Sequence, residues 1–221
     1  MRVAISWSGG KDSCLALHEC IKNGMTPVVL LFMIDPENNC SRSNGIDTEI
    51  LKLQAHCLQL PIYFVESSWA QYEENLIDAL TEVGRLYQLE KCVFGDIDIL
   101  DHQLFEKSVC KKANIRAYLP LWGMSRDLIK DKIISSDIKC KLSVVNRSCK
   151  IDTLLTNDYD SLDFDNLNHL GVDVCGENGE FHTVVYDAPL FKHAIELSLK
   201  SLHVLHSVTL CQFSGRLIAK N

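Results

Sequence analysis

The sequence predicts an α/β fold built on a parallel sheet in its first half, and two observations support this. Apolar, strand-like runs alternate there with runs that place apolar side chains at helical spacing. This alternation is typical of parallel strands joined by right-handed helical crossovers. In addition, the run 28–34 is apolar throughout, as expected for a strand that is covered on both faces.

The elements of the first half follow in a regular order. Strands are expected at residues 3–6, 28–34, 61–65 and 92–95. Helices are expected from residue 11 to Asn23, after Asp47, over 71–89 and after Asp101. Asp101 is expected to cap the last of these helices. Ligands of parallel sheets bind beyond the carboxyl ends of the strands, so the expected binding loops are 7–13, 34–46 and 95–101.

The second half is less regular. Pro120-Leu121-Trp122-Gly123 interrupts the alternation, so we expect a boundary near residue 124, between domains 1–124 and 125–221. Ser125 is expected to cap a helix that runs to Ile133. Further strands are expected at 139–145, 181–186 and 207–213.

The composition is that of an ordinary folded chain. Of the 221 residues, 47% are hydrophobic and 23% are charged, and the formal charge is −7. This balance excludes a disordered chain and argues against a protein that coats nucleic acid non-specifically. No apolar run approaches the roughly 20 residues that span a bilayer, and the N-terminus is not typical of a signal peptide. We therefore expect a cytoplasmic protein that does not act at a membrane.

The ten cysteines are spread singly among apolar residues, and none belongs to a C-x-x-C pair. Secreted chains group their cysteines in loops, and zinc or iron–sulfur sites need paired ligand spacing. We therefore expect free and mostly buried thiols in a reducing compartment.

The most specific pattern is Ser8-Gly9-Gly10-Lys11-Asp12-Ser13, which follows a strand and opens a helix. Glycines let the chain turn sharply and come close to a ligand. The N–H groups at a helix N-terminus bind anions, and the hydroxyls of Ser8 and Ser13 and the Lys11 ammonium add to this. The spacing is not that of a Walker A loop. A phosphate or pyrophosphate group is the expected ligand.

The Ser8–Ser13 segment resembles the pyrophosphate-binding loop (PP-loop) of the adenine nucleotide alpha hydrolase superfamily, the ATP pyrophosphatases. Other segments resemble the diphthine–ammonia ligase family: Gly95-Asp96-Ile97, Asp101-His102, Glu106, Cys110, Pro120-Leu121-Trp122, Cys175-Gly176-Glu177-Asn178-Gly179-Glu180-Phe181-His182-Thr183 and Asp187-Ala188-Pro189-Leu190-Phe191. The resemblance covers nearly the whole chain. It implies a Rossmann-like, parallel-sheet ATP-binding domain of the HUP/PP-loop type, followed by a smaller α+β domain.

The family resemblance implies an ATP-dependent ligase. ATP, a carboxylate and ammonia yield an amide, AMP and pyrophosphate. In archaeal and eukaryotic members the carboxylate belongs to diphthine, a modified histidine on translation elongation factor two. The loop Ser8–Ser13 is then expected to hold the β- and γ-phosphates of ATP, with Mg²⁺ to offset their charge. Asp12 either binds the Mg²⁺ or only orients the loop.

Glu177, Glu180 and His182 are the candidate catalytic residues of the second domain. Two carboxylates three residues apart, beside a histidine, could bind Mg²⁺, hold ammonium or remove the proton that ammonium must lose before it attacks. Such a turn before a strand is otherwise typical of a solvated surface, and the resemblance favours the functional interpretation. Asp96 is a fourth candidate, either as an acid that faces the substrate or as a helix cap.

One loop departs from the family pattern. Asn44 stands where family members usually have a histidine, and an amide cannot titrate near neutral pH. The segment Ser41-Arg42-Ser43-Asn44-Gly45 is closer to bacterial, single-chain members. Bacteria are not expected to make diphthamide, so the identity of the acceptor carboxylate stays open.

Two other functions stay open. A tRNA-modifying enzyme of the same superfamily would adenylate a base, but it favours a basic RNA-binding face and often cysteine pairs. The charge of −7 and the lack of such pairs count against it, so direct RNA binding is not expected. A non-catalytic protein would bind ATP and tolerate the loss of Glu177 and Glu180. A homodimer is compatible with the sequence.

Overall fold

The computed structural model describes residues 1–42 and 44–220, and its contacts divide the chain into two compact units. Unit 1 comprises Met1–Ser8, Asp12–Ser43 and Gln59–Met124. Unit 2 comprises Gly9–Lys11, Asn44–Leu58 and Ser125–Asn221. Ser43, which is part of the segment that resembles bacterial family members, lies outside the described residues. The division into domains 1–124 and 125–221 stays a prediction.

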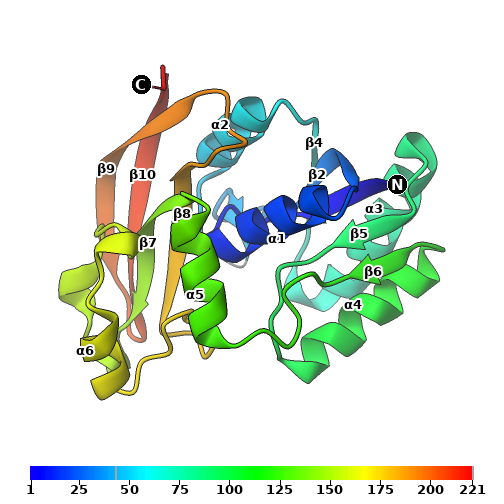
Figure 1. Cartoon of the computed structure of the whole chain (residues 1–221). Helices are drawn as coiled ribbons and strands as arrows, with labels where there is room; N and C mark the ends of the chain where they lie inside the picture. Colours follow the sequence, from blue (N-terminus) through cyan, green and yellow to red (C-terminus); the bar gives the residue numbers. More distant parts are fainter. Residues whose placement is uncertain (43, 221) are drawn as a thin grey trace. The chain divides into compact units, whose positions relative to one another are not determined.

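Unit 1 contains the predicted parallel sheet, which confirms the expected α/β class (Figure 1). The strand order is β3-β2-β1-β5-β6, with β4 paired to β2, and every pair is parallel except β2 with β3. The strands are β1 (Arg2–Ser6), β2 (Thr26–Asp35), β3 (Cys40–Ser41), β4 (Ile62–Glu66), β5 (Lys91–Val93) and β6 (Arg116–Tyr118). The helical elements are α1 (Lys11–Lys22), the short η1 (Trp69–Gln71), α3 (Tyr72–Tyr87) and α4 (Leu100–Lys112).

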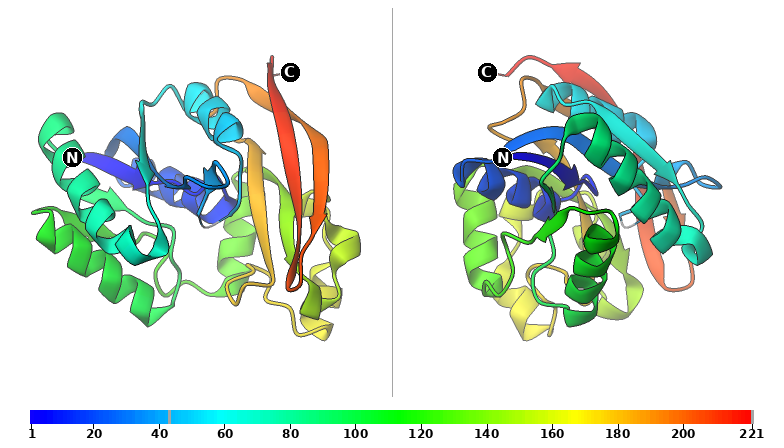
Figure 2. Two further views of the ribbon diagram at one scale, coloured as in Figure 1. Left: turned by 180° about the vertical axis from the view of Figure 1, so that it is seen from behind. Right: turned by 90° about the vertical axis from the view of Figure 1, so that its right-hand side faces the viewer.

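Helices cover both faces of this sheet, as the apolar run in β2 predicts. Figure 2 shows α3 and α4 on one face and α1 on the other. Leu80 and Val83 of α3 are fully buried against Ala4 and Leu31 of the strands. Each fully buried side chain of this size contributes about 1.5–3 kcal/mol. The sheet therefore offers a rigid base for the loops that leave its strand ends.

Two local expectations in unit 1 differ from the structure. Asp101 lies inside the first turn of α4, because that helix already begins at Leu100 with Ile99 at the cap position. The prediction that Asp101 caps the helix is therefore wrong. The loop after β2 also contains the two-residue strand β3, which pairs with Ile34 and Asp35.

Unit 2 is an α+β unit around an antiparallel sheet with the order β8-β7-β10-β9. The strands are β7 (Lys139–Asn146), β8 (Phe181–Asp187), β9 (Ala194–Val204) and β10 (Val208–Ile218). The helical elements are α2 (Thr48–Leu58), α5 (Arg126–Ser135), η2 (Arg147–Cys149), η3 (Asp152–Leu154), η4 (Tyr159–Ser161) and α6 (Phe164–His169). Ser125 caps α5 as predicted, since its hydroxyl accepts from the Leu128 N–H at 3.3 Å.

The long hairpin of β9 and β10, orange to red in Figure 2, is only half predicted by the sequence analysis. β10 (Val208–Ile218) covers all but the first residue of the strand expected at 207–213, whereas β9 is absent from the expected strands. Its signal is present, because Ile195, Leu197 and Leu199 alternate with polar residues at the period of a strand. None of the helices in the described part of the chain is long and apolar enough to cross a membrane.

Candidate active site

The turn between β1 and α1 requires glycine at its first position. Gly9 has a φ of +84°, a conformation that other residues rarely adopt, and an added Cβ would lie within 2.9 Å of Ile46, Leu51 and Gln54. The Gln54 side chain fixes this turn. Its fully buried Nε2 donates to the Gly9 carbonyl at 3.0 Å and to the Val185 carbonyl at 2.7 Å. Gln54 is not among the predicted site residues, although an amide on the apolar face of a helix is a visible signal.

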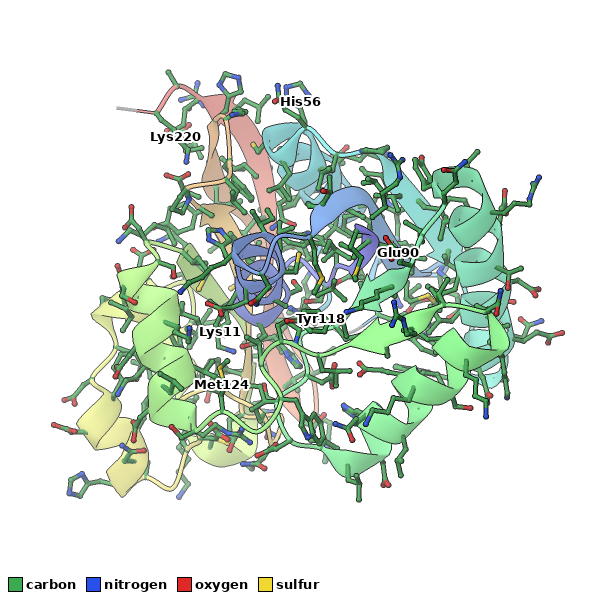
Figure 3. All side chains as sticks on the ribbon, turned by 45° about the vertical axis from the view of Figure 1, so that its right-hand side comes forward. Lys11, His56, Glu90, Tyr118, Met124 and Lys220 are labelled. Carbon is green, nitrogen blue, oxygen red and sulfur yellow. The ribbon has the colours of Figure 1, made fainter. Side chains whose placement is uncertain are left out.

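The next two residues of the loop pack against β8. Gly10 lies beside Asn44 and Thr183, and the Lys11 N–H donates to the Thr183 hydroxyl at 3.1 Å. Only 2% of Lys11 is exposed. Its side chain is labelled in Figure 3. Its ammonium donates to the Cys175 carbonyl at 2.5 Å and lies 5.5 Å from the centre of the Phe181 ring. In this arrangement Lys11 holds the segment before β8, and its expected contact with phosphate stays a prediction.

Ser8, Asp12 and Ser13 belong to unit 1. The Ser8 hydroxyl donates to the Ser13 hydroxyl at 3.2 Å, and Ser13 is buried at the first turn of α1. Gly95, just beyond β5, packs directly on this turn. A Cβ on Gly95 would lie 2.9 Å from the Ser13 nitrogen and 3.1 Å from the Asp12 carbonyl oxygen. Two hydroxyls and the N–H groups of a helix N-terminus thus lie beside the end of a parallel strand, which is a typical place for an anion.

Replacing Gly95 by Ala is expected to lower the free energy of unfolding by about 1–3 kcal/mol, because overpacking forces backbone shifts. The new Cβ would meet backbone atoms of Asp12 and Ser13, which cannot rotate away. Urea denaturation measures the change. Gly84→Ala in α3 is the matched control, since its Cβ meets only the Ile115 side chain at 3.6 Å. Equal stability of the two variants would show that the Gly95 contact is not restrictive.

The segment before β8 is organised by Glu180, of which only 6% is exposed. Its Oε1 accepts from the Asp173 N–H and from the Asn178 side-chain amide, both at 3.1 Å, and its Oε2 accepts from the Asn178 N–H at 3.0 Å. Asp173 in turn accepts from Arg126 Nε at 2.6 Å and from the Cys175 N–H at 2.7 Å. The Glu180 carboxylate is therefore largely committed to the loop itself.

Glu177 and His182 differ from Glu180 in their environment. Both are half-buried, and so retain access to solvent. Glu177 lies in the turn that Glu180 closes, and His182 lies in β8 between the buried Phe181 and Thr183. The structure thus separates the three predicted residues of unit 2 into one carboxylate that holds the loop and two side chains that a small solute can reach.

Asp96 lies at the carboxyl end of the unit 1 sheet, just after β5. Its Oδ1 is 2.7 Å from His102 Nδ1, and 28% of the Asp96 side chain is exposed. The structure therefore places Asp96 in a hydrogen bond with an imidazole of α4. Its expected role as a substrate-facing acid stays a prediction.

The donor set suits a magnesium ion that arrives with a nucleotide. Among the described residues no group of three or more His, Cys, Asp or Glu side chains could hold a metal by itself. Mg²⁺ usually keeps several waters and takes one or two carboxylates together with substrate phosphates. Asp12, at the anion-binding turn, can supply such a carboxylate, so the residues present fit the ion.

Comparison with known proteins finds related sequences over most of the chain. Sequence models of the diphthamide synthase N-terminal and C-terminal domains match residues 1–117 and 131–211. The diphthine–ammonia ligase of Mus musculus is 30% identical, with 94% of this chain and 86% of that protein covered. The Homo sapiens relative of the same name is 28% identical with the same coverage.

A relative from Schizosaccharomyces pombe, also named diphthine–ammonia ligase, is 27% identical over all of this chain but only 40% of its own length. A solved structure described as a predicted subunit of tRNA methyltransferase from Methanocaldococcus jannaschii has a TM-score of 0.45 and 16% identity, with 86% of this chain and 98% of that chain covered. That likeness is too low to support a conclusion. The two domain matches show that the chain belongs to the diphthamide synthase family.

Proposed function

We propose that the chain is an ATP-dependent amide-forming ligase. It transfers AMP from ATP to a carboxylate, and ammonia then displaces AMP to leave an amide, with AMP and pyrophosphate as the other products. The observation that carries the proposal is the turn between β1 and α1, a built anion site in a chain whose relatives are named diphthine–ammonia ligase. A carboxylate is a poor electrophile, so its activation requires a good leaving group such as AMP.

The residues of the turn hold the triphosphate in this proposal. The N–H groups of the first turn of α1 and the hydroxyls of Ser8 and Ser13 bind the β- and γ-phosphates, which leave together as pyrophosphate. Gly9 and Gly10 let the backbone approach these groups. Asp12 binds Mg²⁺, which when present offsets the charge of the phosphates. Lys11 holds the segment before β8 through the Cys175 carbonyl.

The accessible groups of unit 2 act on the small substrate. The Glu177 carboxylate attracts ammonium. His182 lies in β8, two residues after Glu180, whose carboxylate fixes the loop. Glu180 holds the loop that presents Glu177. This division of roles follows from burial, since only Glu180 is closed off from solvent and bonded to backbone N–H groups on both oxygens.

The acceptor that we propose to test first is diphthine on translation elongation factor two, because the relatives carry that name. Asn44, which replaces the usual histidine, donates to the Thr183 carbonyl at 3.3 Å and so stays fixed against β8. We place the reaction in the cytoplasm, since none of the ten cysteines, all of which lie in the described part of the chain, forms a disulfide, which suits a reducing compartment. Of these, eight are buried, and Cys40 and Cys149 are partly exposed. A homodimer stays a prediction.

Burial also argues against sulfur transfer to a base. It raises the pKa of Cys20 to about 12 and that of Cys57 to about 11, and it raises the pKa of Cys92 as well. Thiols of this kind are protonated at neutral pH and are poor nucleophiles. The tRNA-modifying alternative therefore gains no support from these cysteines.

An intact-mass assay tests the proposal. The chain is incubated with ATP, Mg²⁺, ammonium and elongation factor two bearing diphthine, and the conversion of acid to amide is followed together with AMP and pyrophosphate. Amide, AMP and pyrophosphate are expected in equal amounts. An unchanged factor with ATP still bound would exclude diphthine as the acceptor and direct the search to another carboxylate or to RNA.

Ser8→Ala and Asp12→Ala are each expected to abolish turnover while the fold is kept, because they remove groups that act on the phosphates and the metal. Pyrophosphate release measures turnover, and circular dichroism checks the fold. Ser68→Ala, at an exposed serine before η1, is the matched control and should turn over normally. Wild-type rates in either Ser8→Ala or Asp12→Ala would show that the site lies elsewhere.

A further inference from the structure

A buried carboxyl group lies next to Asp96, outside the proposed nucleotide site. Glu106 of α4 is 5% exposed, and its Oε2 finds no hydrogen-bond donor among residues 1–42 and 44–220. Its side chain is instead hydrogen-bonded to the carboxyl group of Asp96. Two ionised carboxylates both accept and cannot bond, so one of the two must carry a proton. The more buried group, Glu106, is the one that gains most from neutrality.

The charges around Glu106 point the same way. Burial raises its pKa to about 11, with the Asp96 carboxylate as the next cause and Cys110 as a smaller one. Tyr72 of α3 also faces this group: burial, and then the charges of Asp96 and Glu106, raise its pKa to about 12, while Arg42 acts in the opposite direction. Within the described part of the chain, no cation offsets the rise in the pKa of Glu106. At neutral pH, Glu106 is therefore a neutral acid that donates its proton to Asp96.

Asp96 has a second partner on its other side. His102 Nδ1 lies 2.7 Å from Asp96 Oδ1, and 56% of the His102 side chain is exposed. Because the Asp96 carboxyl oxygens accept, the bond to His102 places the imidazole proton on Nδ1. Nε2 is then the basic nitrogen of the ring. A carboxylate behind an imidazole fixes its tautomer and stabilises the imidazolium that forms when the ring takes up a proton.

We propose that His102 removes the proton that ammonium must lose before it attacks the activated carboxylate, with Asp96 and Glu106 as positioning residues. The proposal rests on the ligase function proposed above. An N–H bond of ammonium breaks, the electron pair stays on nitrogen and the proton binds His102 Nε2. The electron pair on nitrogen then forms the C–N bond. At the same time the C–O bond to AMP breaks, and AMP leaves with the electron pair of that C–O bond. The amide nitrogen and the imidazolium each release one proton to water.

This assignment explains why a neutral acid lies behind Asp96. A second carboxylate at that place would repel Asp96 and add charge to a buried site, whereas a neutral donor orients Asp96 without adding charge. Glutamine shares this property, since its amide donates and is uncharged. Comparing Glu106→Gln with Glu106→Ala therefore shows whether the site needs only a neutral hydrogen-bond donor or needs the carboxyl group.

A change of nucleophile tests the role of His102. Hydroxylamine is uncharged at neutral pH and needs no base before it attacks, so it forms a hydroxamate from the same activated carboxylate. In His102→Gln the ammonium-dependent rate is expected to fall by about 10²–10⁴-fold, the usual contribution of general base catalysis. Hydroxamate formation is expected to persist. His206→Gln, at an exposed histidine of unit 2, is the matched control and should change neither rate.

The Glu106 variants report on positioning. Glu106→Ala is expected to lower the ammonium-dependent rate and to spare hydroxamate formation, and Glu106→Gln is expected to recover most of the lost rate. Equal losses with both nucleophiles in His102→Gln, or no loss with either, would overturn the proposal while the ligase function stands. If the wild-type chain forms neither amide nor hydroxamate from the acceptor, the ligase function fails and this inference fails with it.

Discussion

Replacing Glu106 by Gln is expected to flatten the dependence of stability on pH. The pKa of Glu106 is about 11 in the folded chain, against an ordinary value of 4.5, so the folded state keeps a proton that the unfolded state releases between these values. The contribution of Glu106 to the free energy of unfolding is complete below the pKa that this group has in the unfolded chain. It is lost as the pH rises toward the pKa that the group has in the folded chain. The slope is about 1.4 kcal/mol per pH unit for one proton. The glutamine of the variant cannot ionise in either state, so the variant lacks this slope.

Urea unfolding at several pH values between about pH 5 and about pH 8 measures the effect. Over this range a single proton changes the free energy of unfolding by roughly 4 kcal/mol. The variant is expected to gain stability over the wild type as the pH rises. Glu74→Gln, at an exposed position of α3, is the matched control and should follow the wild-type curve. Parallel curves for wild type and Glu106→Gln would show that Glu106 is ionised in the folded chain and would remove the basis for its donated hydrogen bond.

Glu180→Ala is expected to cost stability and turnover together, whereas Glu177→Ala is expected to cost turnover alone. Glu180→Ala leaves the two N–H groups of Asp173 and Asn178 and the Asn178 amide without their acceptor. Asn178 is exposed, so water can solvate its two donors, and the loss comes mainly from the partly buried N–H of Asp173, at about 1–3 kcal/mol. Glu177 is half-buried and takes no part in these three bonds, so they remain in Glu177→Ala.

The comparison requires unfolding curves and AMP formation for both variants. Removing a charged contact to ammonium is expected to raise the ammonium KM of Glu177→Ala by about 10–100-fold, since such a hydrogen bond contributes about 1.5–3 kcal/mol. Glu180→Gln, which keeps the shape of the side chain, should lie between the wild type and Glu180→Ala in stability. A stable but inactive Glu180→Ala would reverse the two roles that burial assigns.

Local patterns predict the parallel sheet and the first loop because they depend on neighbours in the chain. The apolar run of β2 by itself predicts a strand covered on both faces, and the glycines between β1 and α1 by themselves predict a sharp turn. β9 is harder to predict although its alternation is clear, because the polar residues of an outer strand face resemble those of a loop. The predicted cap at Asp101 is wrong because helix boundaries shift by a residue or two.

Long-range partners set the remainder of the site, and spacing alone does not reveal them. Gln54 bonds the carbonyls of Gly9 and Val185, which lie 45 and 131 residues away along the chain. Lys11 reaches Cys175, 164 residues away, and its place in the glycine-rich loop does not predict this contact. Glu106 looks like a surface acid on a helix, and only the packing of α4 beside β5 makes it a buried donor.

The distribution of thiols provides one natural labelling position in each unit. Cys40 lies in unit 1 and Cys149 in unit 2, and both are partly exposed, while the other eight cysteines are buried. Thiol-reactive dyes will therefore react first at one position in each unit, without any engineered cysteine. The fluorescence of each dye can therefore report on the surroundings of its own unit during turnover, in the natural sequence.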